Sequence, residues 1–208
     1  GGELETVELL DPTTCMSEPQ NLTDFIVWAK DKYPADRYIL VLWDHGGGFA
    51  SGYGVDDLNE REDGQDTMTA SEIIKAIKAS DVKFDLIGFD ACLMATLETA
   101  VAVEPYADYM IASEEAEPGT GWYYTNWLTA LSGNTSIPTT ELSKIIIDDF
   151  ITKSYQASSR DKTSLSIVDL AEFAAVVPAK LSAFAGESNN TIKSGDFKTA
   201  ADARSVTG

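Results

Sequence analysis

Apolar positions along the chain alternate between helical spacing and short continuous runs. Residues 21–33 place apolar side chains on one helical face, whereas residues 38–44 and 84–91 are almost wholly apolar, which is typical of strands buried on both faces of a parallel sheet. Between these runs, Thr69 and Glu72 have the spacing of a capping box at the start of a helix. Strand, helix and strand in this order predict a βαβ unit with parallel strands and a right-handed crossover.

The same pattern predicts further elements towards the C-terminus. After residue 186 the chain becomes polar and rich in small residues, and we expect little order there. We therefore predict an α/β fold with a mostly parallel sheet flanked by helices, in one domain over residues 1–185 followed by a poorly defined segment over 186–208. The remaining predicted elements are helices over 92–104, 125–131, 139–155 and 171–185, and strands over 109–113 and 164–169.

Composition limits the classes of partner. The 208 residues carry 34 acidic and 15 basic side chains, a formal net charge of −19, which disfavours nucleic acid and anionic lipid and favours basic peptides. No apolar run reaches the length of about 18 residues that a transmembrane helix needs, so we expect no membrane insertion, and the charge favours a monomer. No signal peptide is visible, and both ends resemble cuts made inside a longer protein.

The single histidine and one of the two cysteines stand in comparable places. His45 follows the first predicted strand and Cys92 follows the second, so both should lie at the carboxyl edge of the sheet, on strands about 4.8 Å apart. A thiol beside an imidazole is the minimal equipment for nucleophilic acyl transfer. Because a helix is predicted from residue 92 onwards, its N-terminal dipole would also favour the thiolate of Cys92.

Glycines strengthen this interpretation, although each feature also has an ordinary structural explanation. Gly46 begins a run of three glycines that lets the backbone approach a ligand, and the amides of Gly46 and Cys92 are candidate oxyanion donors. Taken singly, a buried cysteine is a small hydrophobe, a lone histidine is structural, and glycines after a strand form a turn. Cys15 lies in a polar loop without glycines, and we interpret it as non-catalytic.

Three segments carry a resemblance to a known family. YILVLWDHGGG (38–48), DLIGFDACLMATLE (85–98) and SEEAEPGTGW (113–122) resemble the clostripain family of cysteine peptidases, which shares a clan with caspases, gingipains, legumain and separase. The resemblance implies a caspase-like α/β fold and a Cys-His dyad without an obligatory third member. It makes Cys92 the nucleophile and His45 the general acid and base, and it assigns the oxyanion hole to the amides of Gly46 and Cys92.

The resemblance also implies a substrate class. Family members typically cleave after Arg or Lys with an acidic S1 pocket, and Asp90 matches the family's acidic position, although it would also serve as a strand-end cap. Glu114, with Glu115 and Glu117, would add to the negative field or would simply be solvated. Thr120 lies where some relatives are expected to have a second acidic residue, which weakens the expected preference for a basic P1 residue.

Relatives are commonly processed by self-cleavage between the histidine and cysteine strands. The loop over residues 51–68 holds one basic residue, Arg61, so we predict that any cleavage follows it; the alternative is an ordinary surface arginine. No cofactor is required on this interpretation. Calcium binding by the acidic loop is possible, although its spacing is not that of an EF-hand. The acidic side chains of the loop are Asp56, Asp57, Glu60, Glu62, Asp63 and Asp66.

The N-terminal part offers less chain than relatives use before the first helix. Only residues 3–10 are available for a preceding strand, so either the chain begins after the missing strands or another fragment completes the sheet.

Three functions therefore compete. The first is a secreted or envelope-associated bacterial endopeptidase that cuts after Arg or Lys and is activated by self-cleavage. The second is a catalytically silent caspase-like domain that binds basic peptides, against which the intact pair of His45 and Cys92 argues. The third is another thiol acyl-transfer enzyme, such as an amidase or a transpeptidase.

Overall fold

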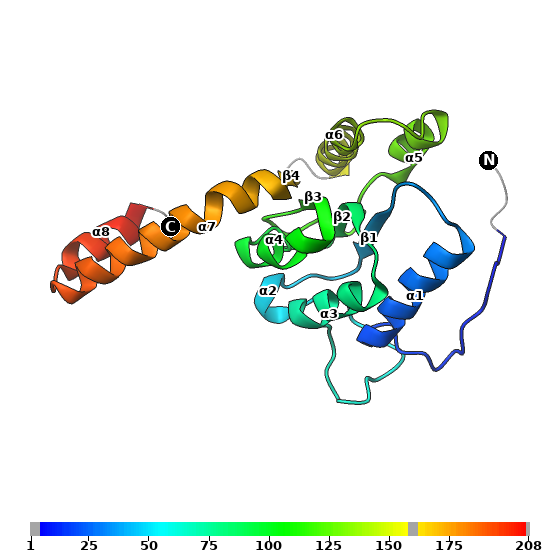
Figure 1. Cartoon of the computed structure of the whole chain (residues 1–208), viewed down its shortest axis with the longest axis horizontal. Helices are drawn as coiled ribbons and strands as arrows, with labels where there is room; N and C mark the ends of the chain where they lie inside the picture. The colour runs from blue at the N-terminus through cyan, green and yellow to red at the C-terminus, as the bar shows by residue number, and fades with distance from the viewer. Residues whose placement is uncertain (1–4, 158–161, 207–208) are drawn as a thin grey trace. The chain divides into compact units, whose positions relative to one another are not determined.

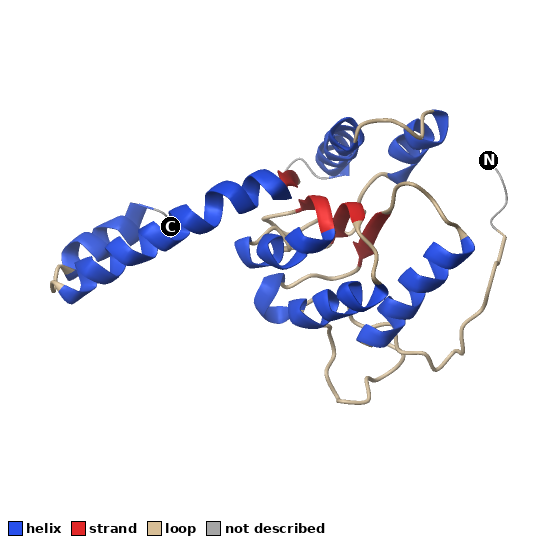
Figure 2. Ribbon diagram, viewed as in Figure 1, coloured by secondary structure: helices blue, strands red, loops and turns tan. Residues whose placement is uncertain are grey.

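A computed structural model describes residues 5–157 and 162–206 of the chain. Contacts divide the chain into two compact units, Gly1–Asp169 and Leu170–Gly208. The first unit contains the sheet and the helices that cover it, as Figures 1 and 2 show. The second consists of two helices that pack on each other, α7 (Leu170–Lys193) and α8 (Phe197–Val206).

The second unit differs from the sequence-based expectation. The helix predicted over 171–185 continues to Lys193, and α8 follows where little order was expected. The domain boundary predicted after residue 185 stays a prediction, since contacts group the chain from residue 170 onwards.

The sheet has four strands in the order in which they occur along the chain. Strands β1 (Ile39–Trp43), β2 (Phe84–Asp90) and β3 (Ala107–Ala112) run parallel, and β4 (Ser166–Asp169) pairs antiparallel with β3. This arrangement confirms the α/β class and the mostly parallel sheet. In the β1–β2 register Trp43 lies opposite Asp90, so the two strands end side by side.

Helices cover both faces of the sheet. In Figure 1, α1 (Pro19–Lys32), α3 (Ala70–Ser80) and α4 (Leu97–Val103) lie on one side, with α1 packed on α3, and α5 (Tyr124–Gly133) and α6 (Thr139–Ala157) lie on the other. The α5–α6 side buries a continuous apolar cluster against the sheet. The cluster consists of Leu86, Ile111, Trp122, Trp127, Ile137, Leu142, Ile146, Phe150 and Leu165. The short α2 (Gly48–Ser51) and a 3-10 turn over Glu104–Tyr106 complete the elements.

Helix starts follow local hydrogen-bonding chemistry. The capping box before α3 is confirmed, because the Thr69 side chain accepts from the Glu72 amide while the Glu72 carboxylate accepts from the Thr69 amide. The helix predicted from residue 92 is wrong in its start, since α4 begins only at Leu97. Thr96 caps α4 by accepting from the amide of Thr99, which leaves the residues from 91 to 96 in a turn.

Strand β1 forms an edge of the described sheet. The expectation that both of its faces are buried holds only in part: Leu40 and Leu42 are buried on one face, Ile39 and Val41 on the other are partly buried against the α5–α6 cluster, and Trp43 at the strand end is 66% exposed. Among the described residues no strand pairs with the outer edge of β1, and residues 5–10 form none.

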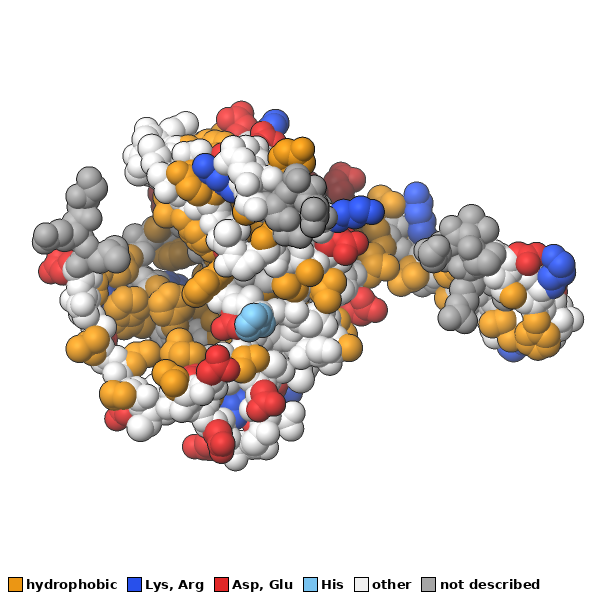
Figure 3. Space-filling model, turned by 180° about the vertical axis from the view of Figure 1, so that it is seen from behind, with side chains coloured by type: hydrophobic (Ala, Val, Ile, Leu, Met, Phe, Trp, Pro, Cys, Tyr) orange, Lys and Arg blue, Asp and Glu red, His pale blue; other side chains and the backbone are white. Residues whose placement is uncertain are grey.

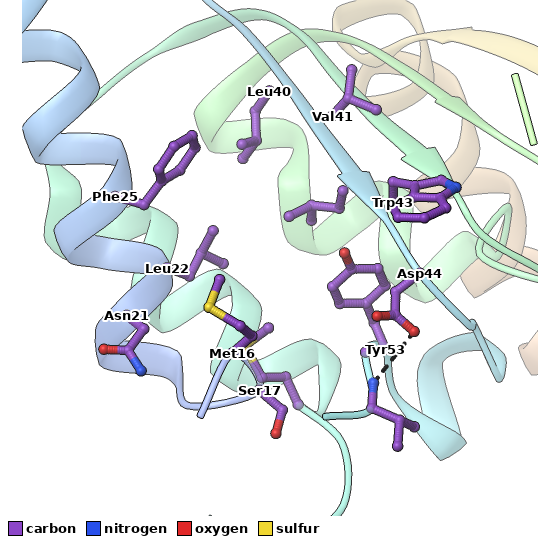
Figure 4. Close-up of a pocket in the computed structure, with 14 residues that line it drawn as sticks. Met16, Ser17, Asn21, Leu22, Phe25, Leu40, Val41, Trp43, Asp44 and Tyr53 are labelled. Carbon is purple, nitrogen blue, oxygen red and sulfur yellow. Dashed lines mark hydrogen bonds between the residues drawn. The ribbon is translucent and has the colours of Figure 1, made fainter. Parts of the chain in front are cut away.

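A groove of about 370 Å³ runs along this edge. Five consecutive residues, 40–44, line the groove. Successive side chains of a strand point to opposite faces of the sheet, so a groove that contacts all five must lie beside the edge of the strand. Figure 4 shows Leu22 and Phe25 of α1 across the groove, with Tyr53 at one end. The groove leaves the outer edge of β1 open to a further extended segment.

The loop over residues 51–68 is anchored by Arg61. Its side chain, in a residue only 5% exposed, pairs with Glu72 at 2.7 Å and with Asp63 at 2.8 Å, and it donates to the carbonyls of Thr67 and Ser17. The hydrogen bond from Arg61 is the main cause that lowers the pKa of Glu72 to about 2. Arg61 is therefore not the surface arginine of the sequence-based alternative; it ties the loop to the start of α3.

We expect Arg61→Met to lower the free energy of unfolding by about 2 kcal/mol at pH 7, because it leaves Glu72 partly buried without its cation while Glu72 keeps some contact with water. The folded-state pKa of Glu72 lies below its unfolded value of 4.5, so this stabilisation is fully present above pH 4.5 and is lost as pH falls towards 2. Urea unfolding of wild type, Arg61→Met and the control Glu62→Gln at pH 7 and pH 3 checks this. Equal stability of Arg61→Met and wild type at pH 7 would contradict it.

Candidate active site

The register of β1 and β2 brings His45 and Cys92 to one place. Trp43 and Asp90 are paired, and each of the two candidate residues lies two positions further along its own strand end. Both line a cavity of about 580 Å³ at the carboxyl edge of the sheet. The histidine, the only one in the chain, lies at the surface in Figure 3. The structure thus places the pair where the sequence predicted.

The Cys92 thiol is held by a turn and by a backbone amide. Cys92 is half-buried, and the amide of Glu117 donates to its Sγ over 3.2 Å. Leu93 adopts φ +64°, a left-handed conformation that is costly for a leucine, and its amide donates to the carbonyl of Glu115. Because α4 begins five residues after Cys92, the expected helix dipole does not start at the thiol; the Cys92 sulfur instead contacts the backbone of Glu117, accepting from its amide and donating to its carbonyl over 3.8 Å.

The backbone of His45 is fixed on both sides. The Asp44 carboxylate accepts from the amides of His45 and Val55, the second bond being drawn in Figure 4, and the His45 carbonyl accepts from the amide of Gly54. No described residue makes a hydrogen bond to the imidazole. The geometry therefore shows a free-standing imidazole on a rigid backbone, with no third residue directing its ring.

Gly46 lies in close contact with the cysteine strand. A Cβ at this position would stand 2.3 Å from the Cys92 carbonyl oxygen and 3.0 Å from its nitrogen, so only glycine allows the two backbones to approach this closely. Within the described part of the chain, neither the Gly46 amide nor the Cys92 amide donates a hydrogen bond. Both are therefore available to the oxyanion of a tetrahedral intermediate.

Asp90 is built into the wall of the same cavity. It is 3% exposed, and its carboxylate accepts from the Trp122 amide at 3.1 Å to each oxygen and from the Tyr124 hydroxyl at 2.8 Å. Gly121, at φ +60°, lets the loop pass close to the carboxylate, since a Cβ there would lie 3.0 Å from Oδ1. Burial raises the pKa of Asp90, and the bonds from Trp122 and Tyr124 oppose that rise.

Glu117 lies in the same wall, a position that its sequence context does not indicate. Both of its carboxylate oxygens are buried, and neither has a hydrogen-bond partner among the described residues. Burial, and then the neighbouring Asp90 carboxylate, raise the pKa of Glu117 to about 8. In the sequence Glu117 is only one of three glutamates in a short segment, and no local signal separates it from the other two.

The other predicted pocket residues lie elsewhere. Glu114 is exposed and accepts from the hydroxyls of Ser164 and Ser166; partial burial raises its pKa, and these bonds lower it below the usual value. Thr120 is exposed and does not line the cavity. The structure therefore brings Asp90 and Glu117 to the reacting pair, but not Glu114 or Thr120.

Several carboxylates of the acidic loop already have partners within the protein. The Asp56 carboxylate is occupied by the amides of Met16 and Leu58, and the Asp63 carboxylate by Arg61. Within the residues that the structure describes, no three carboxylate, cysteine or histidine side chains are grouped to hold a metal ion. Calcium binding stays a prediction of the family resemblance.

A thiol, an imidazole and two free amides at one edge of an α/β sheet constitute the machinery of a cysteine-dependent hydrolase. The model of the clostripain family, peptidase family C11, matches residues 2–203. The chain belongs to the clostripain family of cysteine peptidases.

Individual relatives agree with this assignment. Clostripain of Hathewaya histolytica is 33% identical over 123 residues, which cover 52% of this chain and 23% of clostripain. A secreted C11 cysteine protease from Bacteroides thetaiotaomicron, solved with an irreversible peptide inhibitor, shares the fold with a TM-score of 0.65 at 24% identity, over 78% of this chain and 47% of that one.

A second solved structure is an inactive zymogen of a C11 protease from Parabacteroides distasonis. It gives a TM-score of 0.61 at 27% identity, over 80% of this chain and 44% of that chain. The present chain thus spans less than half the length of each of these relatives.

The two cysteines should differ in reactivity with a soluble alkylating reagent. Cys15 is 6% exposed and its sulfur is hydrogen-bonded to Ser17 and to the Asn59 carbonyl, whereas Cys92 is half-buried beside an open cavity. We expect iodoacetamide to add one group to the folded protein, on Cys92, and a second only after denaturation. Peptide mass mapping of wild type and Cys92→Ala checks this. Equal labelling of both thiols in the folded protein would contradict the described cavity.

Proposed function

We propose that this chain is the catalytic part of a cysteine endopeptidase that cleaves peptide bonds after Arg or Lys. The observation that carries the proposal is the meeting of Cys92, His45 and a buried carboxylate, Asp90, in the wall of one cavity. The first two supply acyl-transfer chemistry, and the third supplies a negative charge for the residue before the scissile bond.

The reaction follows from the positions of the groups. His45 takes the proton of the Cys92 thiol, and the thiolate attacks the carbonyl carbon of the scissile bond. The amides of Gly46 and Cys92 donate to the resulting oxyanion. His45 then gives its proton to the leaving amine, and water hydrolyses the thioester by the reverse sequence, which restores the thiol.

Charge in the cavity supports a basic P1 residue. Four carboxylates line it, Asp44, Asp57, Asp90 and Glu117, and the described lining contains no Lys or Arg. Asp90 is the most buried of them, so a guanidinium or ammonium group that reached it would be paired away from water, where an ion pair is strongest. An acidic P1 side chain would be repelled.

We expect fluorogenic peptides with Arg or Lys at P1 to be hydrolysed and matched peptides with Asp or Leu at P1 to be left intact. Cys92→Ala should abolish turnover. Asp90→Asn should lower kcat/KM for the Arg peptide by at least about 30-fold, which corresponds to about 2 kcal/mol for a buried charge pair that is broken. Initial rates under first-order conditions measure each effect.

Different outcomes would indicate the competing functions. A folded chain that binds Arg peptides without turnover would support the silent, peptide-binding domain. Turnover that transfers the acyl group to an added amine, or that releases only ammonia, would support a transpeptidase or an amidase. An unchanged kcat/KM for the Arg peptide in Asp90→Asn would contradict the proposal that Asp90 binds the P1 side chain.

We further propose self-cleavage after Arg61 in the loop over residues 51–68. A relative solved as an inactive zymogen supports processing in this family. The buried ion pair of Arg61 with Glu72 sets a condition, because the side chain must leave its partners before it can enter an S1 pocket. Cleavage therefore requires local opening of the loop.

We expect slow nicking of the wild type after Arg61, faster nicking in Glu72→Gln because the loop opens more often, and an intact chain in Cys92→Ala. Intact-mass measurements over a time course, with Arg61→Gln as the control for the cleavage position, check this. Nicking of Arg61→Gln at the wild-type rate would place the processing site elsewhere, and an intact wild-type chain would rule out self-cleavage.

We propose a secreted or envelope-associated location in a bacterium. The support is a relative described as a secreted C11 protease. In the described residues, no helix combines the length and apolar character needed to cross a membrane.

A further inference from the structure

The two buried carboxylates in the cavity wall have unequal surroundings. Asp90 accepts hydrogen bonds from the Trp122 amide and the Tyr124 hydroxyl, which stabilise its ionised form. Glu117 has both oxygens buried, and neither makes a hydrogen bond to a described residue; the nearby Trp122 side chain and Ala91 amide oppose only part of the rise in its pKa. If one of the two must be neutral, it is therefore Glu117 that carries the proton.

Two adjacent buried carboxylates resist double ionisation. Each buried charge loses hydration, and two like charges repel each other strongly in a medium of low dielectric constant. Burial is the largest cause that raises the pKa of Glu117, followed by its hydrogen-bonding contact with the Asp90 carboxylate and then by the Asp90 charge. The pair therefore titrates as a unit, and it keeps one proton to a higher pH than an exposed carboxylate would.

We propose that Asp90 and Glu117 together recognise the basic P1 side chain, holding one proton between them in the empty pocket and releasing it to solvent when the cation enters. This inference rests on the proposed function, because it requires a cationic substrate group in this cavity. A guanidinium or ammonium group placed between the two carboxylates takes over the role of the proton. Its positive charge then allows both carboxylates to be ionised at once. Glu117–COOH then becomes Glu117–COO⁻, and the proton goes to the buffer.

Other titratable groups line the cavity beside the pair, and the test must separate them from it. Tyr53 is buried and Tyr124 is half-buried, and burial is the first cause that raises the pKa of each, so they stay protonated donors. Asp44 and Asp57 line the same cavity, as do His45 and Cys92. Working in the Cys92→Ala background removes the thiol from the count.

Glu117 also connects specificity to the nucleophile. Its side chain lies in the pocket wall with Asp90, while its backbone amide donates to the Cys92 sulfur. The residue whose side chain would meet the cation is thus the residue whose backbone amide contacts the Cys92 sulfur.

Calorimetry with butylguanidinium, a probe with the P1 arginine's charged group, tests the proposal in the Cys92→Ala chain. Titrations at pH 7 in two buffers of different ionisation enthalpy give the number of protons released. We expect close to one proton released per probe bound, and an affinity that rises up to tenfold per pH unit between pH 6 and 8, as one linked proton requires. Adding Glu117→Gln should reduce the release to near zero and remove this slope, whereas Glu98→Gln, an exposed carboxylate on α4, should change neither.

The outcomes separate this inference from the proposed function. Binding of butylguanidinium but not of neutral butylurea, without proton release, would overturn the shared proton and leave the basic pocket intact. The same release in the Glu117→Gln background would overturn the role of Glu117. Failure of butylguanidinium to bind at all would overturn the basic pocket and this inference with it. If the Glu117→Gln variant does not fold, the proton count in the Cys92→Ala, His45→Gln chain decides the matter, because both the thiol and the imidazole are then absent from the cavity.

Discussion

The parallel pairing of β1 with β2 in a single register is the constraint on which the site depends. With Trp43 opposite Asp90, the residues that follow the two strands leave the sheet together, and a slip of one position would separate the imidazole from the thiol. Gly46 makes this pairing possible beyond the strand ends, because its lack of a side chain lets the two backbones touch at Cys92. The reacting pair, the free amides and the acidic wall all follow from this one alignment.

The segment from Glu117 to Tyr124 converts the strand ends into a pocket. Its amides and one hydroxyl bond to Asp90 and to the Cys92 sulfur, so a single loop positions both the carboxylate proposed for specificity and the proposed nucleophile. Gly121 permits the tight passage beside Asp90. Burial of two carboxylates in such a wall is unfavourable for folding, and the proposed recognition of a cation would give this buried charge a use.

The buried charge of Arg61, unlike the two carboxylates in the cavity wall, is paired within the protein. There a buried cation is matched by carboxylates, so that the loop between the two strands is fixed rather than open. An arginine that the sequence marked as a processing residue is also a structural anchor. The two roles are compatible only if processing is preceded by local unfolding, which makes the stability of this loop the factor that sets its rate.

Sequence patterns by themselves determined the α/β class, the parallel strands, the capping box of α3 and the joint position of His45 and Cys92, because these depend on local periodicity and on where strands end. Tertiary structure alone decided which acidic side chains meet. Glu114 and Glu117 are equivalent in the sequence, but the fold turns one towards serines at the surface and the other into the wall beside Asp90. It also decided that the residues after Cys92 form a turn, and that Arg61 is buried. Burial and cross-chain contacts arise from segments far apart in the sequence, and no local pattern encodes them.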